Sequence, residues 1–263
     1  MTILITGASS GFGASLLSHL SSLGHTVIGT SRHPAADSQL LKLDVRDPEN
    51  CRQIVSEVIL KHGRIDVLIN NAGMGLGGAA ELTTTEEFHL QMETNFFGTV
   101  NMCRAVLPTM RKFRCGKIVN FSSIAGRFAI PYQGPYSCSK FAINAYSQAL
   151  ALETRQFNID VLLIEPGDFA TGFTSSRINS QSTEDSPDYR ESYLRTRKCF
   201  EHDETNGAKP DYLAKKIAKI IKSKHPKFHN VITPSLTQQL SVFLFTLLPS
   251  RLSFAILRKF YRV

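Results

Sequence analysis

The chain has 263 residues, of which 42% are hydrophobic and 20% charged, with 30 Lys and Arg against 22 Asp and Glu. This composition excludes a disordered, collagen-like or coiled-coil chain, and the length is sufficient for a core that needs no disulfides. The five cysteines form no C-x-x-C pair, which argues against a disulfide scaffold or a zinc site and favours a reducing, cytoplasmic compartment.

Short β-branched runs alternate with amphipathic helical patterns along the chain. Most of the runs are apolar on both faces, as strands buried in a parallel sheet are. The alternation predicts an α/β fold with a doubly wound parallel sheet, and no linker divides it, so one domain is expected over 1–263. The predicted strands are Ile3–Thr6, Thr26–Thr30, Leu40–Leu43, Ile65–Asn70, Gly116–Phe121 and Ile159–Glu165, and the predicted helices lie near 13–23, 48–62, 86–113, 136–157 and 211–223.

A glycine-rich loop, Thr6–Gly13, follows the first predicted strand and opens the first helix. Glycines permit a tight turn and let a phosphate approach the backbone, while the helix N-terminus offers N–H groups to an anion. A purely structural turn is the alternative, but the strand–turn–helix context favours a dinucleotide site.

The second predicted strand ends at Thr30-Ser31-Arg32-His33, where an NAD enzyme usually has an acid for the ribose hydroxyls. The fork of an arginine pairs well with a 2′-phosphate. Arg32 therefore predicts NADP(H) in preference to NAD(H), with a solvated surface arginine as the alternative.

Tyr136 and Lys140 are four residues apart in a strong helical pattern, so they share a helix face. A cation near a phenol favours the phenolate and lowers its pKa, which suits proton transfer. The spacing alone is weak, because Tyr212 and Lys216 have it too. Tyr136 is preferred because Ser122-Ser123 ends the preceding strand, where a hydroxyl can donate to a substrate carbonyl.

Two later segments depart from the alternating pattern. Residues 171–209 are polar and rich in turn formers, and they predict either a lid over the site or a mobile surface insertion. Residues 209–263 carry 11 basic side chains and one acid, against 19 basic and 21 acidic in residues 1–208. The segment 236–263 mixes apolar residues with arginines, which suits either a helix lying on anionic lipid or a helix covering the pocket. Its aromatic residues lie among aliphatic ones, which argues against nucleic-acid binding.

Taken in order, these motifs resemble the short-chain dehydrogenase/reductase family over about residues 1–235. The resemblance implies a Rossmann-type α/β/α fold and places catalytic roles on Asn95, Ser123, Tyr136 and Lys140. The cofactor contacts that it implies are Gly7, Ser9, Ser10, Gly11, Phe12, Gly13, Arg32, Asp44, Val45, Asn70, Asn71, Ala72, Gly73, Tyr136, Lys140, Pro166, Gly167 and Thr171.

The implied reaction is hydride transfer between NADP(H) and a carbonyl or alcohol, with no metal. Tyr136 would transfer the proton, Ser123 polarise the carbonyl, Lys140 bind the ribose and favour the phenolate, and Asn95 hold a relay water. The chain looks most like the hydroxysteroid and retinol dehydrogenase-like branch, which implies a lipophilic steroid, retinoid or fatty-chain substrate. Family analogy implies a homodimer or homotetramer. The alternatives are a non-catalytic NADP-binding sensor or scaffold, and a membrane-surface protein that binds through the basic tail.

Overall fold

The computed structural model describes the backbone of residues 1–263 and all side chains except those of Leu236 and Thr237. A parallel sheet of seven strands lies at the centre, in the order β3-β2-β1-β4-β6-β7-β9. From one edge to the other these are β3 (Leu41–Lys42), β2 (Thr26–Ser31), β1 (Thr2–Ile5), β4 (Val67–Asn70), β6 (Gly116–Phe121), β7 (Ile159–Pro166) and β9 (His229–Ile232). The strand order reverses between β1 and β4, and the crevice outside such a reversal is where open α/β sheets bind ligands.

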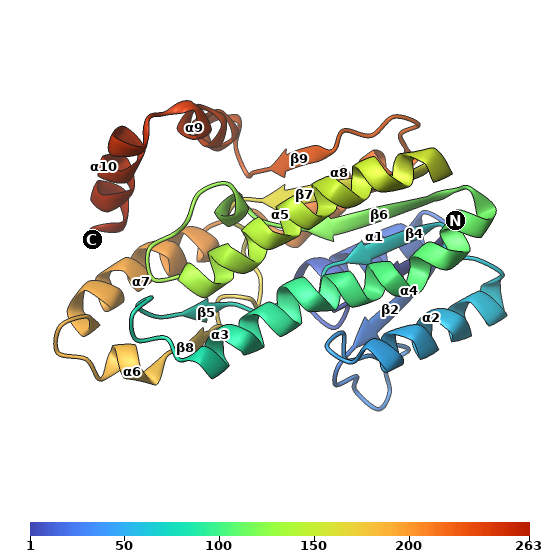
Figure 1. The fold of residues 1–263 in the computed structure, drawn as a ribbon, viewed down its shortest axis with the longest axis horizontal. Helices are drawn as coiled ribbons and strands as arrows, with labels where there is room; N and C mark the ends of the chain where they lie inside the picture. The colour runs from blue at the N-terminus through green and yellow to red at the C-terminus, as the bar shows by residue number, and fades with distance from the viewer.

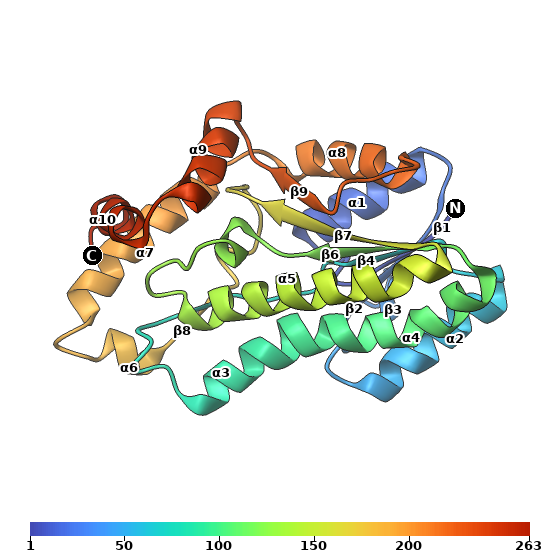
Figure 2. The same cartoon turned by 45° about the horizontal axis from the view of Figure 1, so that its top comes forward.

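Helices cover both faces of the sheet, so the prediction of a doubly wound three-layer fold is confirmed (Figures 1 and 2). α1 (Gly11–Ser22) and α8 (Pro210–Lys222) pack side by side on one face. α2 (Pro48–His62), α4 (Gly98–Phe113) and α5 (Gly134–Thr154) cover the other face. Each face has its own apolar core, because the central strands are buried on both sides.

The long helix predicted over 86–113 is interrupted. α3 (Thr85–Met92) begins at a capping box made by Thr84 and Glu87, and α4 begins only at Gly98. Between them Glu93–Phe97 forms a π-helical turn. Such turns are rare and frequently occur at functional sites, and this one carries Asn95.

Beyond the carboxyl edge of the sheet lies a group of smaller elements (Figure 1). A two-stranded pair, β5 (Leu76–Gly77) and β8 (Ile178–Asn179), is followed by α6 (Gln181–Glu184) and α7 (Arg190–Thr205). The polar segment 171–209 is therefore largely helical, because Tyr193, Thr196 and Phe200 give α7 one buried stripe. Two short 3₁₀ turns, at Ile124–Gly126 and Arg155–Phe157, complete the body.

The chain ends in α9 (Leu236–Leu247) and α10 (Ser250–Tyr261), which lie at the end of the molecule that carries α7 (Figures 1 and 2). Over the described part of the chain, none of the helices has the length and apolarity to cross a membrane. Neither α9 nor α10 belongs to the layers around the sheet.

Candidate active site

The glycine loop is held against the end of β4 by a set of short hydrogen bonds. Thr6 Oγ1 accepts from the backbone N–H groups of Asn71, at 3.1 Å, and Ala72, at 3.0 Å. The Asn71 amide donates to the carbonyl oxygens of Thr6 and Gly7, at 3.0 and 2.9 Å. A Cβ atom at Gly13 would lie 2.2 Å from the Gly7 oxygen, so the loop can close this tightly only with glycine at that position.

A cavity of about 760 Å³ runs from this loop to Tyr136. It joins the two halves of the predicted site, the nucleotide-binding loop and the Tyr–Lys pair. The predicted residues that line it are Gly7, Ser9, Ser10, Gly11, Phe12, Arg32, Asp44, Val45, Asn71, Ala72, Gly73, Ser123, Tyr136, Lys140, Pro166, Gly167 and Thr171.

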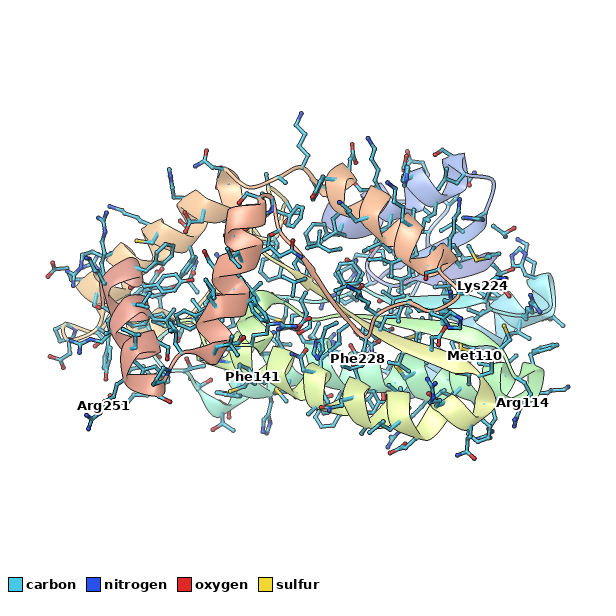
Figure 3. All side chains as sticks on the ribbon, turned by 90° about the horizontal axis from the view of Figure 1, so that it is seen from above. Met110, Arg114, Phe141, Lys224, Phe228 and Arg251 are labelled. Carbon is cyan, nitrogen blue, oxygen red and sulfur yellow. The ribbon has the colours of Figure 1, made fainter. Side chains whose placement is uncertain are left out.

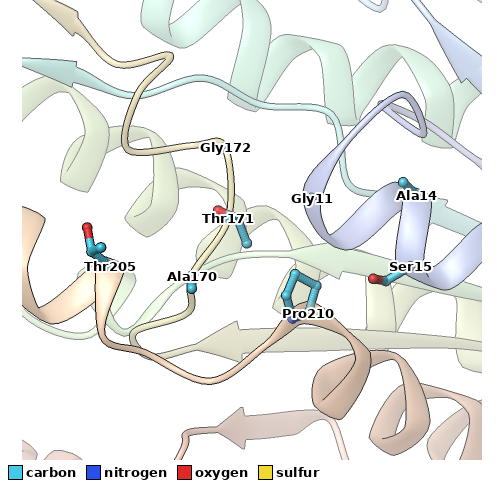
Figure 4. Close-up of a pocket in the computed structure, with 8 residues that line it drawn as sticks. All are labelled: Gly11, Ala14, Ser15, Ala170, Thr171, Gly172, Thr205 and Pro210. Carbon is cyan, nitrogen blue, oxygen red and sulfur yellow. The ribbon is translucent and has the colours of Figure 1, made fainter.

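A second cavity of about 520 Å³ adjoins the first (Figure 4). Gly11, Thr171 and Gly172 line both cavities. The figure shows its lining residues on the start of α1 and on the facing segment that carries Thr171, with Pro210 below them and Thr205 beyond Ala170. The segment predicted as a lid thus borders the glycine loop directly.

Three predicted residues do not line the main cavity but support it from behind. Gly13 packs on the loop, as described above. The Asn70 amide donates 2.9 Å to Asn120 Oδ1 in the core. Asn95 clamps the backbone of Met74, since its Oδ1 accepts from Met74 N at 2.8 Å and its Nδ2 donates to Met74 O at 3.0 Å. These contacts are those of a buried amide with its hydrogen bonds satisfied, and the relay-water role of Asn95 stays a prediction.

The end of the cavity near β2 is cationic. Arg32, His33 and Arg46 line it, and Arg32 Nε donates to His33 Nε2 at 3.1 Å. Arg46 donates hydrogen bonds to both carboxylate oxygens of Asp44, and its guanidinium lowers the pKa of that carboxyl. Among the described contacts, Arg32 is therefore the arginine of this group that forms no ion pair with a carboxylate. Sequence reasoning missed His33 and Arg46, although both adjoin residues that it selected.

Ser123, Tyr136 and Lys140 meet at the other end, where β6 gives way to a short turn. Ser123 caps this turn, and its Oγ accepts from Ala125 N at 3.1 Å. Lys140 is buried, donates 2.9 Å to the carbonyl of Phe121 and lies 5.5 Å from the centre of the Tyr136 ring. Burial without a carboxylate partner lowers the pKa of Lys140 to about 8.

The pKa of Tyr136 differs from the value that its spacing from Lys140 suggests. Burial raises the pKa of this phenol to about 12, and its hydrogen bond with Ser123 acts in the opposite direction. In the chain without cofactor, the effect of burial therefore outweighs that of the Ser123 hydrogen bond. A working pKa closer to neutrality would need hydrogen bonds or charges that the protein alone does not supply.

The pair Tyr212 and Lys216 shows how little the four-residue spacing determines. Lys216 Nζ lies 5.3 Å from the Tyr212 ring centre, which is nearly the geometry of Lys140 and Tyr136. Tyr212 is exposed on α8, however, and neither Tyr212 nor Lys216 lines the main cavity. Burial and neighbouring polar groups therefore distinguish the Tyr136–Lys140 pair from the Tyr212–Lys216 pair.

Segments from the end of the molecule enclose Tyr136. The Phe173 ring lies 5.6 Å from the Tyr136 ring, and Phe173, Thr174 and Glu204 line the cavity. Behind Tyr136, Leu257 and Tyr261 of α10 belong to the same apolar cluster. No side chain of α9 or α10 among the described residues lines the main cavity, so α10 packs behind the site and does not close its mouth. Sequence reasoning missed Glu204, which lies in a polar stretch with no pattern to mark it.

Comparison with known proteins points to one family. The sequence matches the short chain dehydrogenase family over residues 1–182. It is 52% identical over 264 residues to a 3-ketodihydrosphingosine reductase of Bacteroides thetaiotaomicron, covering 99% of this chain and 98% of the relative. It is 34% identical over 250 residues to retinol dehydrogenase 8 of Bos taurus, covering 86% of this chain and 79% of that one.

A solved structure has the same fold. The crystal structure of a short-chain dehydrogenase from Streptomyces avermitilis superimposes with a TM-score of 0.83 and 31% identity, over 99% of this chain and 97% of the other. The similarity therefore includes the C-terminal helices as well as the sheet.

Proposed function

The chain belongs to the short-chain dehydrogenase family and is an oxidoreductase of that family, and on this premise we propose that it reduces the ketone of a long-chain lipid with NADPH. One observation carries the proposal. A single cavity joins the glycine loop and Arg32 at one end to Ser123, Tyr136 and Lys140 at the other.

The residues fit a dinucleotide on structural grounds. Gly7 and Gly13 lie so close to backbone atoms that there is no room for a Cβ atom at either position, and α1 begins at this loop with its N-terminus. Ser9 and Arg32 would hold the 2′-phosphate, which is why we propose NADP(H) in preference to NAD(H). When bound, the cofactor would supply the hydride.

We assign the proton chemistry to the side chains around Tyr136. Ser123 Oγ would donate to the carbonyl oxygen and Tyr136 Oη would give it a proton, while Lys140 would bind ribose hydroxyls and favour the phenolate. Asn95 fixes the Met74 backbone at the cavity and, through the Ser139 hydroxyl, the first turn of α5. We keep the relay water of Asn95 as part of this proposal.

The substrate assignment rests on the relatives and on the walls of the cavity. Two of the relatives, a 3-ketodihydrosphingosine reductase and a retinol dehydrogenase, are named after lipid substrates. Apolar side chains line the cavity near Tyr136, and polar ones, Thr174, Ser176 and Glu204, lie beside them. This mixture suits a lipid with a polar head better than a wholly apolar steroid. The apolar side chains are Met74, Leu90, Ile130, Phe173 and Ile178.

We further propose that residues 171–209 act as the substrate lid and that the protein works as a homodimer or homotetramer. The contact between the Phe173 and Tyr136 rings supports the lid. Five free cysteines support a reducing, cytoplasmic environment.

The test is NADPH oxidation with 3-ketodihydrosphingosine, all-trans-retinal and a steroid ketone. We expect turnover of the first to be fastest, and Tyr136→Phe to reduce kcat by about 100-fold or more, since general acid catalysis contributes that much. Tyr212→Phe is the matched control and should retain full activity, because its pair lies outside the cavity. Cofactor binding without turnover of any substrate would instead support a non-catalytic sensor.

A further inference from the structure

The two C-terminal helices present an unusually apolar outer surface. Eight large apolar side chains of α9 and α10 are at least 42% exposed. In α9 they recur at intervals of three and four residues, so they form one continuous outward face. The eight are Leu240, Phe243, Leu244 and Leu247 in α9, and Leu252, Phe254, Ile256 and Phe260 in α10. We call them the apolar tail surface.

Contacts with the body fix which face of each helix points outward. In α9, Val242 is buried and the Phe245 ring lies 4.7 Å from that of Phe128. In α10, Tyr261 is buried and its carbonyl accepts a 3.0 Å hydrogen bond from the Thr196 hydroxyl of α7. In α9 the apolar tail surface is thus the side opposite the packed face. In α10 its side chains flank the packed face, with Leu252, Ile256 and Phe260 on one side and Phe254 on the other.

The charges around this surface have one sign. Residues 236–263 contain four basic side chains, Arg251, Arg258, Lys259 and Arg262, and no acid. All four are exposed, and Figure 3 places Arg251 at the outer end of the molecule with its side chain pointing away from the body. On α10 the arginines adjoin a stripe formed by Leu252, Ile256 and Phe260, at intervals of four. A partner must therefore accept apolar side chains and carry negative charge.

We propose that α9 and α10 form a docking surface for an anionic lipid bilayer, with the apolar tail surface inserted among the acyl chains and the four cations at the head groups. Helices with an apolar face bordered by Lys and Arg bind membranes in this way. A second copy of the chain fits less well, because a symmetric contact between two such surfaces would bring like charges together.

The docking surface lies close to the catalytic groups. Leu257 and Tyr261 on the inner side of α10 share an apolar cluster with Tyr136. If the proposed function holds, a lipid substrate would reach the cavity from the bilayer without crossing bulk water. This consequence rests on the proposed function, whereas the docking itself does not.

Vesicle flotation with the whole 263-residue chain tests the docking. Vesicles of phosphatidylcholine alone are compared with vesicles that also contain phosphatidylglycerol, at low and high salt. We expect binding to the anionic vesicles, weakened by salt because exposed charges are screened. The variant Phe243→Glu/Leu247→Glu should lower the partition coefficient at least about tenfold, since two charges replace side chains that enter the apolar region.

The control variant is Leu60→Glu/Phe113→Glu, which alters two exposed apolar side chains far from the tail and should bind vesicles like the wild type. A thermal melt and turnover of a small water-soluble ketone without vesicles check the fold of each variant. That turnover also tests the proposed function separately from docking. Absence of vesicle binding by the wild type, or equal losses in both variants, would overturn the proposal. So would a Phe243→Glu/Leu247→Glu protein that floats normally but loses its oligomeric mass, since the surface would then bind a second copy.

Discussion

Replacing Lys140 with methionine should stabilise the cofactor-free protein while it abolishes activity. The ammonium group is buried, and its described polar contact is with the carbonyl of Phe121. Its pKa falls from 10.5 to about 8. Because one pKa unit is worth about 1.36 kcal/mol, keeping the charged lysine in the folded protein costs about 3 kcal/mol. Losing the hydrogen bond to Phe121 costs about 1 kcal/mol, so Lys140→Met should gain about 2 kcal/mol near neutral pH.

The gain depends on pH in a direction that can be worked out. The folded protein releases the Lys140 proton near pH 8 and the unfolded chain near pH 10.5, so between these values the unfolded state binds more protons. Wild-type stability therefore rises with pH across this window, and the advantage of the variant disappears above it. Below pH 8 the penalty is present in full.

Urea unfolding followed by circular dichroism, near pH 7 and near pH 10 without cofactor, measures both effects. Lys216→Met serves as the control, because this lysine is exposed and its loss should change stability by less than about 0.5 kcal/mol. A Lys140→Met protein less stable than the wild type near pH 7 would refute the reasoning. So would an advantage that is the same at both pH values, since it could not come from the lysine charge.

Three further changes test other parts of the site. Arg32→Ala should weaken NADPH binding by about 10- to 100-fold and leave NADH binding nearly unchanged, because it removes one charge-assisted contact; isothermal titration with both cofactors measures this. Gly13→Ala should abolish cofactor binding, since its Cβ would lie 2.2 Å from a loop carbonyl, whereas Gly134→Ala meets its neighbour at an ordinary 3.8 Å and should bind normally. Burial raises the pKa of Asp168 from 3.8 to about 6, so the wild type should lose stability relative to Asp168→Asn as pH rises through that window. Thermal melts of the two proteins near pH 4 and pH 7 check the sign.

The layers of the fold and most of the site could be predicted because their signals are local. Strands buried on both faces appear in the sequence as continuous apolar runs. The loop Thr6–Gly13 and the segment Asn70–Gly73 each mark the end of such a strand. The topology of a parallel sheet then brings these ends to one edge. β9 was missed because it is an edge strand whose first residues, His229 and Asn230, are polar and exposed or half-buried.

The parts that sequence reasoning could not supply depend on tertiary contacts. α7 buries a stripe of only three side chains in a polar stretch, so its periodicity is too weak to distinguish from a loop. The π-helical turn at Glu93–Phe97 leaves no mark in the pattern of 86–113. For the tail, the sequence left lipid contact and pocket cover as alternatives. In the structure none of the described residues of α10 lines the main cavity: Tyr261 packs behind the site, and Phe260 is exposed on an adjoining side of the helix, where we propose the lipid contact.

The two Tyr–Lys pairs show what makes a short motif chemically useful. Spacing of four residues gives almost the same ring-to-ammonium distance in both, so the motif alone cannot separate them. Burial in α5 moves the pKa of Tyr136 up and that of Lys140 down, and each shift disfavours the charged form. Groups held against their charged forms respond strongly to new hydrogen-bond partners, because little solvent competes with those partners. Tyr212 and Lys216 are exposed and do not line the main cavity, and for that reason we expect proton transfer at Tyr136 alone.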